Sequence, residues 1–299
     1  MTVPDAAPLR AHEDPALFRE ALAYTAAETG FVSRLIEKDY FCTVLLQHLA
    51  AAGSTLVFRG GTCLAKVHVG FYRLSEDLDF LIPTPTSATR GERSRRTESA
   101  KRAVGAVGKT LPGLRVVEPL TGANASTQYD AVIAYRSLLG PEEETIKIEV
   151  GLREPLLSPA VVEPARTLLL DPVSATPLAP VVPLHCLSWQ EAMAEKLRAA
   201  LSRREAAIRD FYDVDHAVRR LGFTALEPGF VALVGKKLRM PGNGPVDVSA
   251  ARLAALRPQL GAQLKPVLRA VDFAQFDLDR AFRTVAEVAE ALDAEPGGR

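Results

Sequence analysis

The chain has few cysteines and no surplus of charge of either sign. Only three of its 299 residues are cysteines, Cys42, Cys63 and Cys186, and they lie far apart without a C-x-x-C pair. This spacing argues against a disulfide framework and against a cysteine zinc knuckle. Lys and Arg number 36, and Asp and Glu also number 36, so the formal net charge is zero. A protein with a wholly positive surface, such as a histone-like binder, is therefore excluded, whereas a local basic face is not.

Long apolar runs are also absent. No stretch approaches the roughly eighteen uninterrupted apolar residues of a membrane span, and the N-terminus lacks a basic segment followed by an apolar one. We therefore expect a cytoplasmic protein with no membrane partner. Hydrophobic residues make up 47% of the chain, which suffices for a sizeable core and excludes wholesale disorder.

The order of the expected elements indicates an α+β protein. Asp14 and Pro15 begin a helix that Gly30 ends, and a second helix follows from Ser33 to Gly53. Further on, a helix over 87–109 is expected among strands at 56–58, 77–80, 114–117, 127–135, 145–150 and 166–170. After about residue 183 the pattern is helical, starting with a capping box at Ser188 and Glu191. We expect a mixed-sheet domain over 1–183, including the two N-terminal helices, and a helical domain over 184–299.

The segment that carries the most chemical information is 58–80. Asp77 and Asp79 alternate with apolar residues, so both carboxylates face one side of a strand, with Cα atoms about 6–7 Å apart. Carboxylates at that spacing can hold one Mg²⁺ ion or two neighbouring ones. Upstream, Gly60 and Gly61 let the backbone approach a triphosphate closely, with Thr62 and amide groups as donors. An acidic pair alone would indicate only a solvated strand, but together with the glycine turn it predicts a nucleotide site.

Two further groups could complete this site. Glu149 alternates with apolar residues, so an adjacent strand could bring it beside the acidic pair as a third metal ligand; an ordinary exposed glutamate is the alternative. Lys196 lies between small residues on a predicted helix and could neutralise a nucleotide phosphate. Asp210 and Asp213 share one helix face and could meet this lysine. A charged amphipathic helix pair is the alternative for this second group.

Basic residues are concentrated locally. The segment 90–115 has eight Lys and Arg residues against two Glu, which gives 8 − 2 = +6. Such a run is often only a solvated helix face, but it is also typical of a surface that binds an RNA backbone. The candidate RNA contacts are Arg90, Arg93, Arg95, Arg96, Lys236, Lys237 and Arg239.

Taken together, these motifs resemble the AbiEii/AbiGii toxin family of nucleotidyltransferase-like proteins, including the mycobacterial MenT toxins. The matching pieces are F-R-G-G-T-x-L at 58–64, R-L-S-E-D-L-D-F at 73–80, E-x-x-x-E-K-L-x-A-x-L at 191–201 and R-D-F-Y-D at 209–213. The resemblance implies a polymerase β-like nucleotidyltransferase core, followed by a helical domain across a basic cleft. It further implies a toxin paired with a cognate antitoxin, which adds nucleotides from an NTP, often a pyrimidine, to the tRNA 3′ acceptor end and blocks translation.

The resemblance also assigns roles to individual residues. Asp77 and Asp79 match the family's metal-binding acids, Lys196 its essential lysine and Asp210 its later aspartate. Ser75 matches the serine of the motif, a position that an antitoxin phosphorylates in some members. Cys63 departs from the family pattern, in which a serine is common.

Two other functions fit the same motifs. The first is nucleotidyl transfer to a small-molecule or protein hydroxyl instead of RNA. The second is a nucleotide- or RNA-binding module that has lost catalysis. The basic segment favours RNA as the acceptor, and the intact acids and lysine argue against lost catalysis.

Overall fold

The computed structural model describes residues 9–53 and 55–294. The chain divides into two compact units, Met1–Leu187 and Ser188–Arg299. The boundary that we expected after residue 183 falls within the last strand of the first unit, Val182–Cys186. Within the described residues, no helix is long and apolar enough to cross a membrane.

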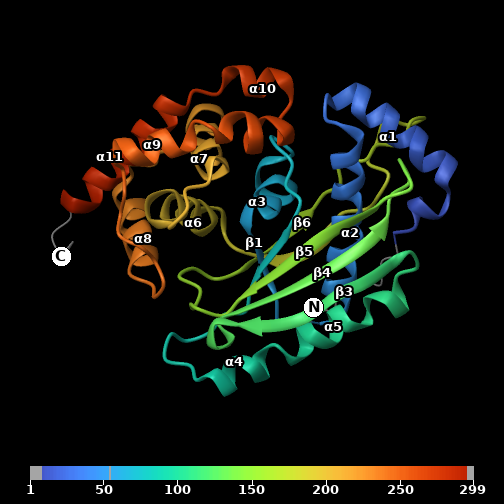
Figure 1. The fold of residues 1–299 in the computed structure, drawn as a ribbon, viewed down its shortest axis with the longest axis horizontal. Helices are drawn as coiled ribbons and strands as arrows, with labels where there is room; N and C mark the ends of the chain where they lie inside the picture. Colours follow the sequence, from blue (N-terminus) through green and yellow to red (C-terminus); the bar gives the residue numbers. More distant parts are fainter. Residues whose placement is uncertain (1–8, 54, 295–299) are drawn as a thin grey trace. The chain divides into compact units, whose positions relative to one another are not determined.

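The first unit contains the sheet and the helices that cover it (Figure 1). Its helices are α1 (Pro15–Thr29), α2 (Ser33–Ala51), α3 (Gly60–Cys63), α4 (Arg90–Arg96) and α5 (Glu98–Thr110), with shorter helical turns at Ala11–Glu13, Leu64–Val69 and Asn124–Ser126. Its strands are β1 (Val57–Arg59), β2 (Leu78–Leu81), β3 (Leu114–Ala123), β4 (Gln128–Arg136), β5 (Glu143–Gly151), β6 (Val161–Ala165) and β7 (Val182–Cys186).

The seven strands form one mixed sheet in the order β3-β4-β5-β2-β1-β7-β6. The pairs β2/β5 and β1/β7 are parallel, whereas the other neighbours are antiparallel. The three central strands β5, β2 and β1 therefore come from segments far apart in the chain. The expected α+β fold with a mixed sheet followed by helices is confirmed.

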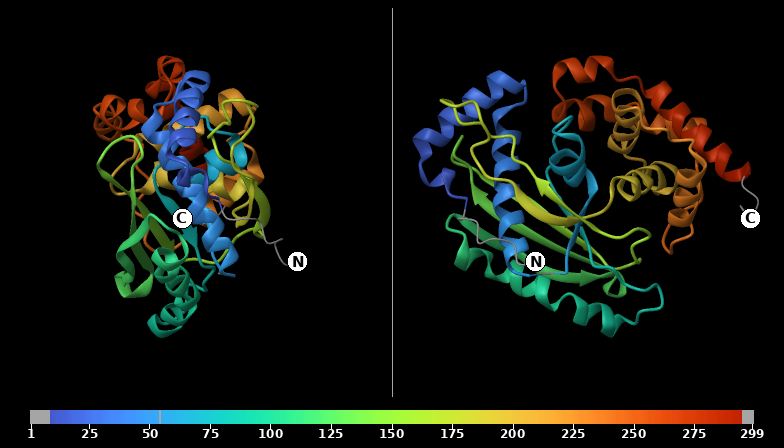
Figure 2. Two further views of the ribbon diagram at one scale, coloured as in Figure 1. Left: turned by 90° about the vertical axis from the view of Figure 1, so that its right-hand side faces the viewer. Right: turned by 180° about the vertical axis from the view of Figure 1, so that it is seen from behind.

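One face of this sheet is covered by α1, α2 and α5, which share a single hydrophobic core with it. Helix α2 runs across the strands (Figure 2) and stacks Phe41 on Tyr135 of β4 at 4.1 Å. On β5, Ile146, Ile148 and Val150 are fully buried in this core. Because successive side chains of a strand point to opposite faces, the residues between them lie on the face away from the core.

Two expected elements differ in the structure. The helix expected over 87–109 is divided at Thr97, whose hydroxyl donates to the Ser94 carbonyl at 2.7 Å. The prediction of a strand over 166–170 is wrong, because the strand of this region, β6, covers Val161–Ala165 and ends before residue 166. Pro164 lies in β6, which the sheet order places at an edge, where a residue without an N–H is tolerated.

The second unit is helical. It consists of α6 (Trp189–Ser202), α7 (Ile208–Leu221), α8 (Pro228–Leu238), α9 (Ala250–Leu256), α10 (Ala270–Gln275) and α11 (Leu278–Ala294), with helical turns at Leu260–Leu264 and Lys265–Val267. The rings of Phe211 on α7 and Phe282 on α11 stack with centroids 5.7 Å apart. Helix α7 is followed by the C-cap Gly222, whose left-handed φ of 65° favours glycine.

The capping box expected at the start of α6 is only half formed. The Ser188 hydroxyl accepts a hydrogen bond from the Glu191 amide at 3.3 Å. The Glu191 carboxylate, instead of returning to the backbone, binds Lys237 Nζ of α8 at 2.8 Å. Both ends of this ion pair have side chains with 0% exposure, so it lies in the interior of the helical unit.

Candidate functional site

The two acids predicted to hold a metal lie at the start of β2. Leu78 and Phe80 are buried in the core, at 0% and 2% exposure, while Asp77 and Asp79 are partly exposed. The strand begins at Leu78, so Asp79 belongs to it and Asp77 precedes it. Thr62 fixes the backbone here, since its hydroxyl donates to the Asp77 carbonyl at 2.5 Å. The alternation therefore directs both carboxylates away from the core.

The glycine turn encloses side chains of this acidic segment. Gly60 has a φ of +77°, and a Cβ built on it would lie 2.2 Å from Asp79 Oδ2. A Cβ on Gly61 would lie 2.3 Å from a guanidinium nitrogen of Arg73, a side chain that is 1% exposed. The space predicted for a triphosphate at these Cβ positions is therefore filled by Asp79 and Arg73. Both glycines are required because the two side chains pack directly against the backbone.

Glu149 lies beside Asp79, as the adjacent-strand reading predicted. The parallel pair β2/β5 makes Asp79 and Glu149 register partners. On the other side of β5, the antiparallel pair with β4 places Asp130 opposite Glu149. Asp77, Asp79, Asp130 and Glu149 thus come from three neighbouring strands on the sheet face away from the core. Asp130 was missed by the sequence analysis, although its alternation with the core residues Tyr129 and Ala131 places it on this face.

A lysine already binds to these carboxylates. Lys147 of β5 forms a hydrogen-bonded ion pair with Glu149, and its Nζ lies 3.7 Å from Asp130 Oδ1. The hydrogen bond to Glu149 raises the pKa of Lys147, and the negative charges of Glu149, Asp130 and Asp77 raise it further. Sequence reasoning also missed Lys147. Its ammonium shows that the field of this group favours a cation, and carboxylate oxygens are the ligands that Mg²⁺ prefers. Asp79 and Glu149, as register partners, and the neighbouring Asp77 therefore offer oxygen donors of the kind that Mg²⁺ prefers.

The segment before β2 is anchored to α2. Glu76 accepts a hydrogen bond from Lys38 Nζ at 2.9 Å and one from Arg34 at 3.2 Å. Burial opposes ionisation of Glu76, but these hydrogen bonds and charges outweigh it and lower its pKa. Ser75, the neighbouring residue in the motif, is partly exposed.

The second predicted cluster is assembled within the helical unit. Lys196 Nζ of α6 lies 2.9 Å from Asp210 Oδ1 and 2.9 Å from Asp213 Oδ2, both on α7. The Lys196 side chain is 13% exposed, and the two carboxylates are 6% and 0% exposed. Asp210 Oδ2 is buried without a hydrogen bond, with Arg203 at 3.5 Å. The i, i+3 spacing on α7 thus brings both aspartates to the lysine.

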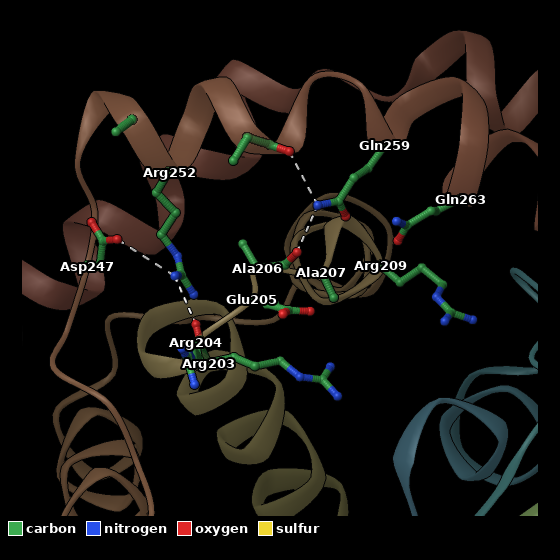
Figure 3. Close-up of a pocket in the computed structure, with 12 residues that line it drawn as sticks. Arg203, Arg204, Glu205, Ala206, Ala207, Arg209, Asp247, Arg252, Gln259 and Gln263 are labelled. Carbon is green, nitrogen blue, oxygen red and sulfur yellow. Dashed lines mark hydrogen bonds and ion pairs between the residues drawn. The ribbon is translucent and has the colours of Figure 1, made fainter.

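A polar pocket of about 720 Å³ lies next to this cluster in the same unit (Figure 3). Arg252 spans it, donating to the carbonyls of Ala200 at 2.8 Å and Arg203 at 3.0 Å at the end of α6. The other cationic side chains that line it are Arg203, Arg204 and Arg209. The sequence analysis did not predict this pocket, because its residues lie on separate helices and loops.

The predicted RNA contacts separate into exposed and buried residues. Arg90, Arg95 and Arg96 of α4 are exposed and Arg93 is partly exposed. Lys236 and Arg239 are exposed as well. The prediction that Lys237 contacts RNA is wrong, because its side chain is 0% exposed and binds Glu191 at 2.8 Å and Glu195 at 3.2 Å. An ammonium in that position cannot contact RNA.

Comparisons with known proteins identify relatives of the chain. The sequence model of the family described as "Nucleotidyl transferase AbiEii toxin, Type IV TA system" matches residues 44–290. Among solved structures, the fold is similar to MenT4, a nucleotidyltransferase toxin from Mycobacterium tuberculosis H37Rv. The identity is 23%, the TM-score is 0.56, and the match covers 93% of this chain and 98% of that chain.

It is also similar to JHP933 from Helicobacter pylori, with 15% identity, a TM-score of 0.51, and coverage of 87% of this chain and 92% of that chain. At these identities the two structures establish the fold. A search of curated protein sequences found no match.

Proposed function

Because the chain belongs to the AbiEii family of nucleotidyltransferase toxins of type IV toxin–antitoxin systems, we propose that it adds nucleotides from an NTP to the tRNA 3′ acceptor end. Blocking aminoacylation in this way stops translation, and a pyrimidine NTP is the expected donor. The observation that carries the proposal is the carboxylate group on the sheet face away from the core, in which Asp79 and Glu149 are register partners and Asp77 lies two residues before Asp79.

In the proposed reaction Asp77 and Asp79 would hold Mg²⁺, and Glu149, which binds Lys147 in this structure, would be a third ligand. The bound ion would neutralise charge on the NTP phosphates and activate the attacking 3′-hydroxyl. Gly60 and Gly61 keep Asp79 and Arg73 in place, and Thr62 holds the backbone at Asp77. These residues therefore fix the positions of the two acids.

In the helical unit, we assign phosphate neutralisation to Lys196. Its ammonium is oriented by Asp210 and Asp213, so the side chain loses little conformational freedom when a phosphate binds. Asp210 Oδ2 is buried and lies 3.5 Å from Arg203, so we assign to Asp210 the positioning of Lys196 and not contact with the substrate.

RNA is the proposed acceptor because exposed arginines supply phosphate contacts. Arg90, Arg95 and Arg96 lie on α4, and the exposed Arg204 and the partly exposed Arg209 line the pocket of the helical unit. A cognate antitoxin protein is the proposed partner, as in other members of the family.

The test is transfer of labelled nucleotide by the purified full chain. The protein is incubated with each α-labelled NTP, Mg²⁺ and total tRNA, and the tRNA 3′ ends are sequenced. Label at the 3′ ends supports the proposal. Label on a small molecule or a protein would show that the acceptor is not RNA. RNA binding without transfer would indicate a module that has lost catalysis.

The matched variant is Asp79→Asn, which keeps the size of the side chain above Gly60 but removes its charge. We expect transfer to fall by about 10³-fold or more, since stabilisation by a metal site contributes several kcal/mol. Thermal unfolding should be nearly unchanged. Glu118→Gln, at an exposed position of β3, is the control and should retain transfer. Wild-type transfer by Asp79→Asn would remove the metal site from the mechanism.

A further inference from the structure

Three potential metal ligands meet within the first unit, apart from the carboxylate group. They are Cys63 at the end of α3, His68 in the helical turn that follows, and Cys186 at the end of β7. One ligand atom of each lies within 4.8 Å of the others. Cys63 and Cys186 are both 0% exposed, and His68 is partly exposed.

The sheet topology explains this meeting. In the parallel pair β1/β7, Phe58 is the register partner of Cys186. The chain turns at Gly60 into α3, which returns Cys63 to the end of β7. The two cysteines are thus neighbours although most of the first unit separates them in sequence.

The orientation of His68 is suited to metal binding. Its Nε2 lies 3.0 Å from the carbonyl oxygen of Leu187. A carbonyl only accepts, so Nε2 is the donor in this contact and Nδ1 is the ring nitrogen left to bind a metal. A neutral imidazole that donates its other N–H to a backbone carbonyl is the usual arrangement of a metal-bound histidine.

The third cysteine, Cys42, lies outside this cluster. Burial raises the pKa of Cys42 to about 12. Cys42 therefore behaves as an ordinary core thiol and serves as a matched control for the cluster.

We propose that Cys63, His68 and Cys186 form a Zn²⁺ site. Two thiolates and one imidazole are soft and borderline ligands that favour Zn²⁺ over Mg²⁺ or Ca²⁺. Binding as two thiolates releases the thiol protons of Cys63 and Cys186 to solvent. Three protein ligands leave the fourth tetrahedral position for water, which can enter on the partly exposed side of His68.

Such a site would connect two segments of the first unit. Cys63 is the last residue of the helix that begins with Gly60 and Gly61, and Cys186 ends β7. The ion would therefore hold the glycine turn against the end of β7. This role is independent of the proposed nucleotidyl transfer and can be tested without an activity assay.

The experiment is a Co²⁺ titration of the full chain, purified reduced and free of metal. We expect one equivalent to produce the thiolate-to-cobalt absorption and d–d bands of a tetrahedral site, and Zn²⁺ to abolish both. Cys186→Ser and Cys63→Ser should lose this spectrum, whereas Cys42→Ser should keep it. Zn²⁺ should raise the Tm of the wild type and of Cys42→Ser only.

A second variant covers the case in which a buried serine prevents folding. His68→Gln changes a partly exposed residue and can still donate to the Leu187 carbonyl, but it removes the ligand nitrogen. We expect its affinity for Co²⁺ to fall about tenfold or more. A reduced wild type without thiolate-to-cobalt absorption, or an unchanged spectrum in folded Cys186→Ser, would overturn the proposal.

Discussion

Gly60 is the position at which one added methyl group would change the acidic site most. Its φ of +77° is in the left-handed region, and the missing Cβ leaves room for the Asp79 carboxylate. A Cβ at this position would therefore displace either the Asp79 carboxylate or the backbone turn at Gly60. A substitution here affects the metal site through geometry, without removing any of its ligands.

We predict that Gly60→Ala abolishes transfer and lowers the free energy of unfolding by about 1–3 kcal/mol, the range of a residue held in strained backbone. The control is Gly105→Ala. A Cβ at Gly105 meets nothing within 4 Å in the middle of α5, so this change should stabilise the protein by about 0.5–1 kcal/mol. Both values come from urea unfolding. An active Gly60→Ala protein would show that Asp79 can be displaced without loss of transfer.

Single residues were predictable from the sequence where the signal was local. The alternation around Asp77 and Asp79 showed which face they occupy, and the i, i+3 pair on α7 indicated contact with Lys196. The meeting of Cys63 with Cys186 was not predictable, because it depends on the long-range pair β1/β7. Sequence spacing alone argued against a cysteine metal site.

Helix α8 is joined to α6 by an ion pair in the interior of the helical unit. Lys237 binds Glu191 and Glu195, and both Lys237 and Glu191 have side chains with 0% exposure. Interior charges of this kind are costly when one partner is removed, because the other stays desolvated.

We therefore predict that Lys237→Met lowers the free energy of unfolding by about 3–5 kcal/mol. Lys236→Ala, at the exposed neighbouring position, should change it by less than about 0.5 kcal/mol. Guanidinium chloride unfolding followed by circular dichroism measures both. Equal stability of the two variants would mean that Glu191 regains water or a new partner.

The contact between α2 and the segment before β2 should make stability depend on pH. The pKa of Glu76 is lowered from its ordinary value of 4.5 by Lys38 and Arg34, against the effect of burial. A lowered pKa means that the stabilisation is fully present above pH 4.5 and is lost as the pH falls through the lower folded-state value.

We predict that the Tm of the wild type falls more steeply than that of Glu76→Gln between about pH 5 and pH 3. At neutral pH the variant should have the lower Tm. Glu118→Gln, exposed on β3, should follow the wild-type curve. Parallel curves for Glu76→Gln and wild type would show that the ionised Glu76 carboxylate adds no stability through Lys38 and Arg34.

Most elements followed from local patterns, and the exceptions have physical causes. Asp14 and Gly30 bound α1 as expected, since the Asp14 carboxylate accepts from two amides and Gly30 has a φ of 75°. Strands β6 and β7 were not predicted, because Pro164 and Pro183 interrupt their patterns. The two prolines are register partners near the sheet edge, a tertiary fact that the local sequence does not contain.

For the molecule as a whole, zero net charge coexists with a basic helix. The arginines of α4 are exposed or partly exposed on the first unit. If they contact tRNA phosphates, the affinity must depend on salt, because each contact releases counterions from the RNA.

We predict that the double change Arg90→Ala/Arg95→Ala makes the slope of log K against log[salt] for tRNA binding shallower by about 1.5. Each lost phosphate contact accounts for about 0.7–0.9 of this change. NTP binding should be unchanged. Arg283→Ala, at an exposed position of α11, is the control with an unaltered slope. Fluorescence anisotropy between low and moderate salt gives the values. An unaltered slope in the double variant would place the RNA elsewhere.

The division into a sheet unit and a helical unit was apparent from the sequence, but the order of the strands was not. Strands β5, β2 and β1 are central and adjacent, yet long helical and loop segments separate them in the chain. The adjacency of β2 and β5 brings Glu149 to Asp79 as expected, whereas Asp130 reaches this group through β4, which pairs with β5, and was not predicted.

The tight packing of Gly60 against Asp79 and of Gly61 against Arg73 has a consequence for a bacterial population that carries this gene. Every base change at the first or second position of a glycine codon either introduces a side chain or ends translation. Cells that escape poisoning should therefore often carry lesions in these two codons. Where the change introduces a side chain and not a stop codon, the encoded protein would keep its full length, so such survivors would still produce the chain without its transfer activity.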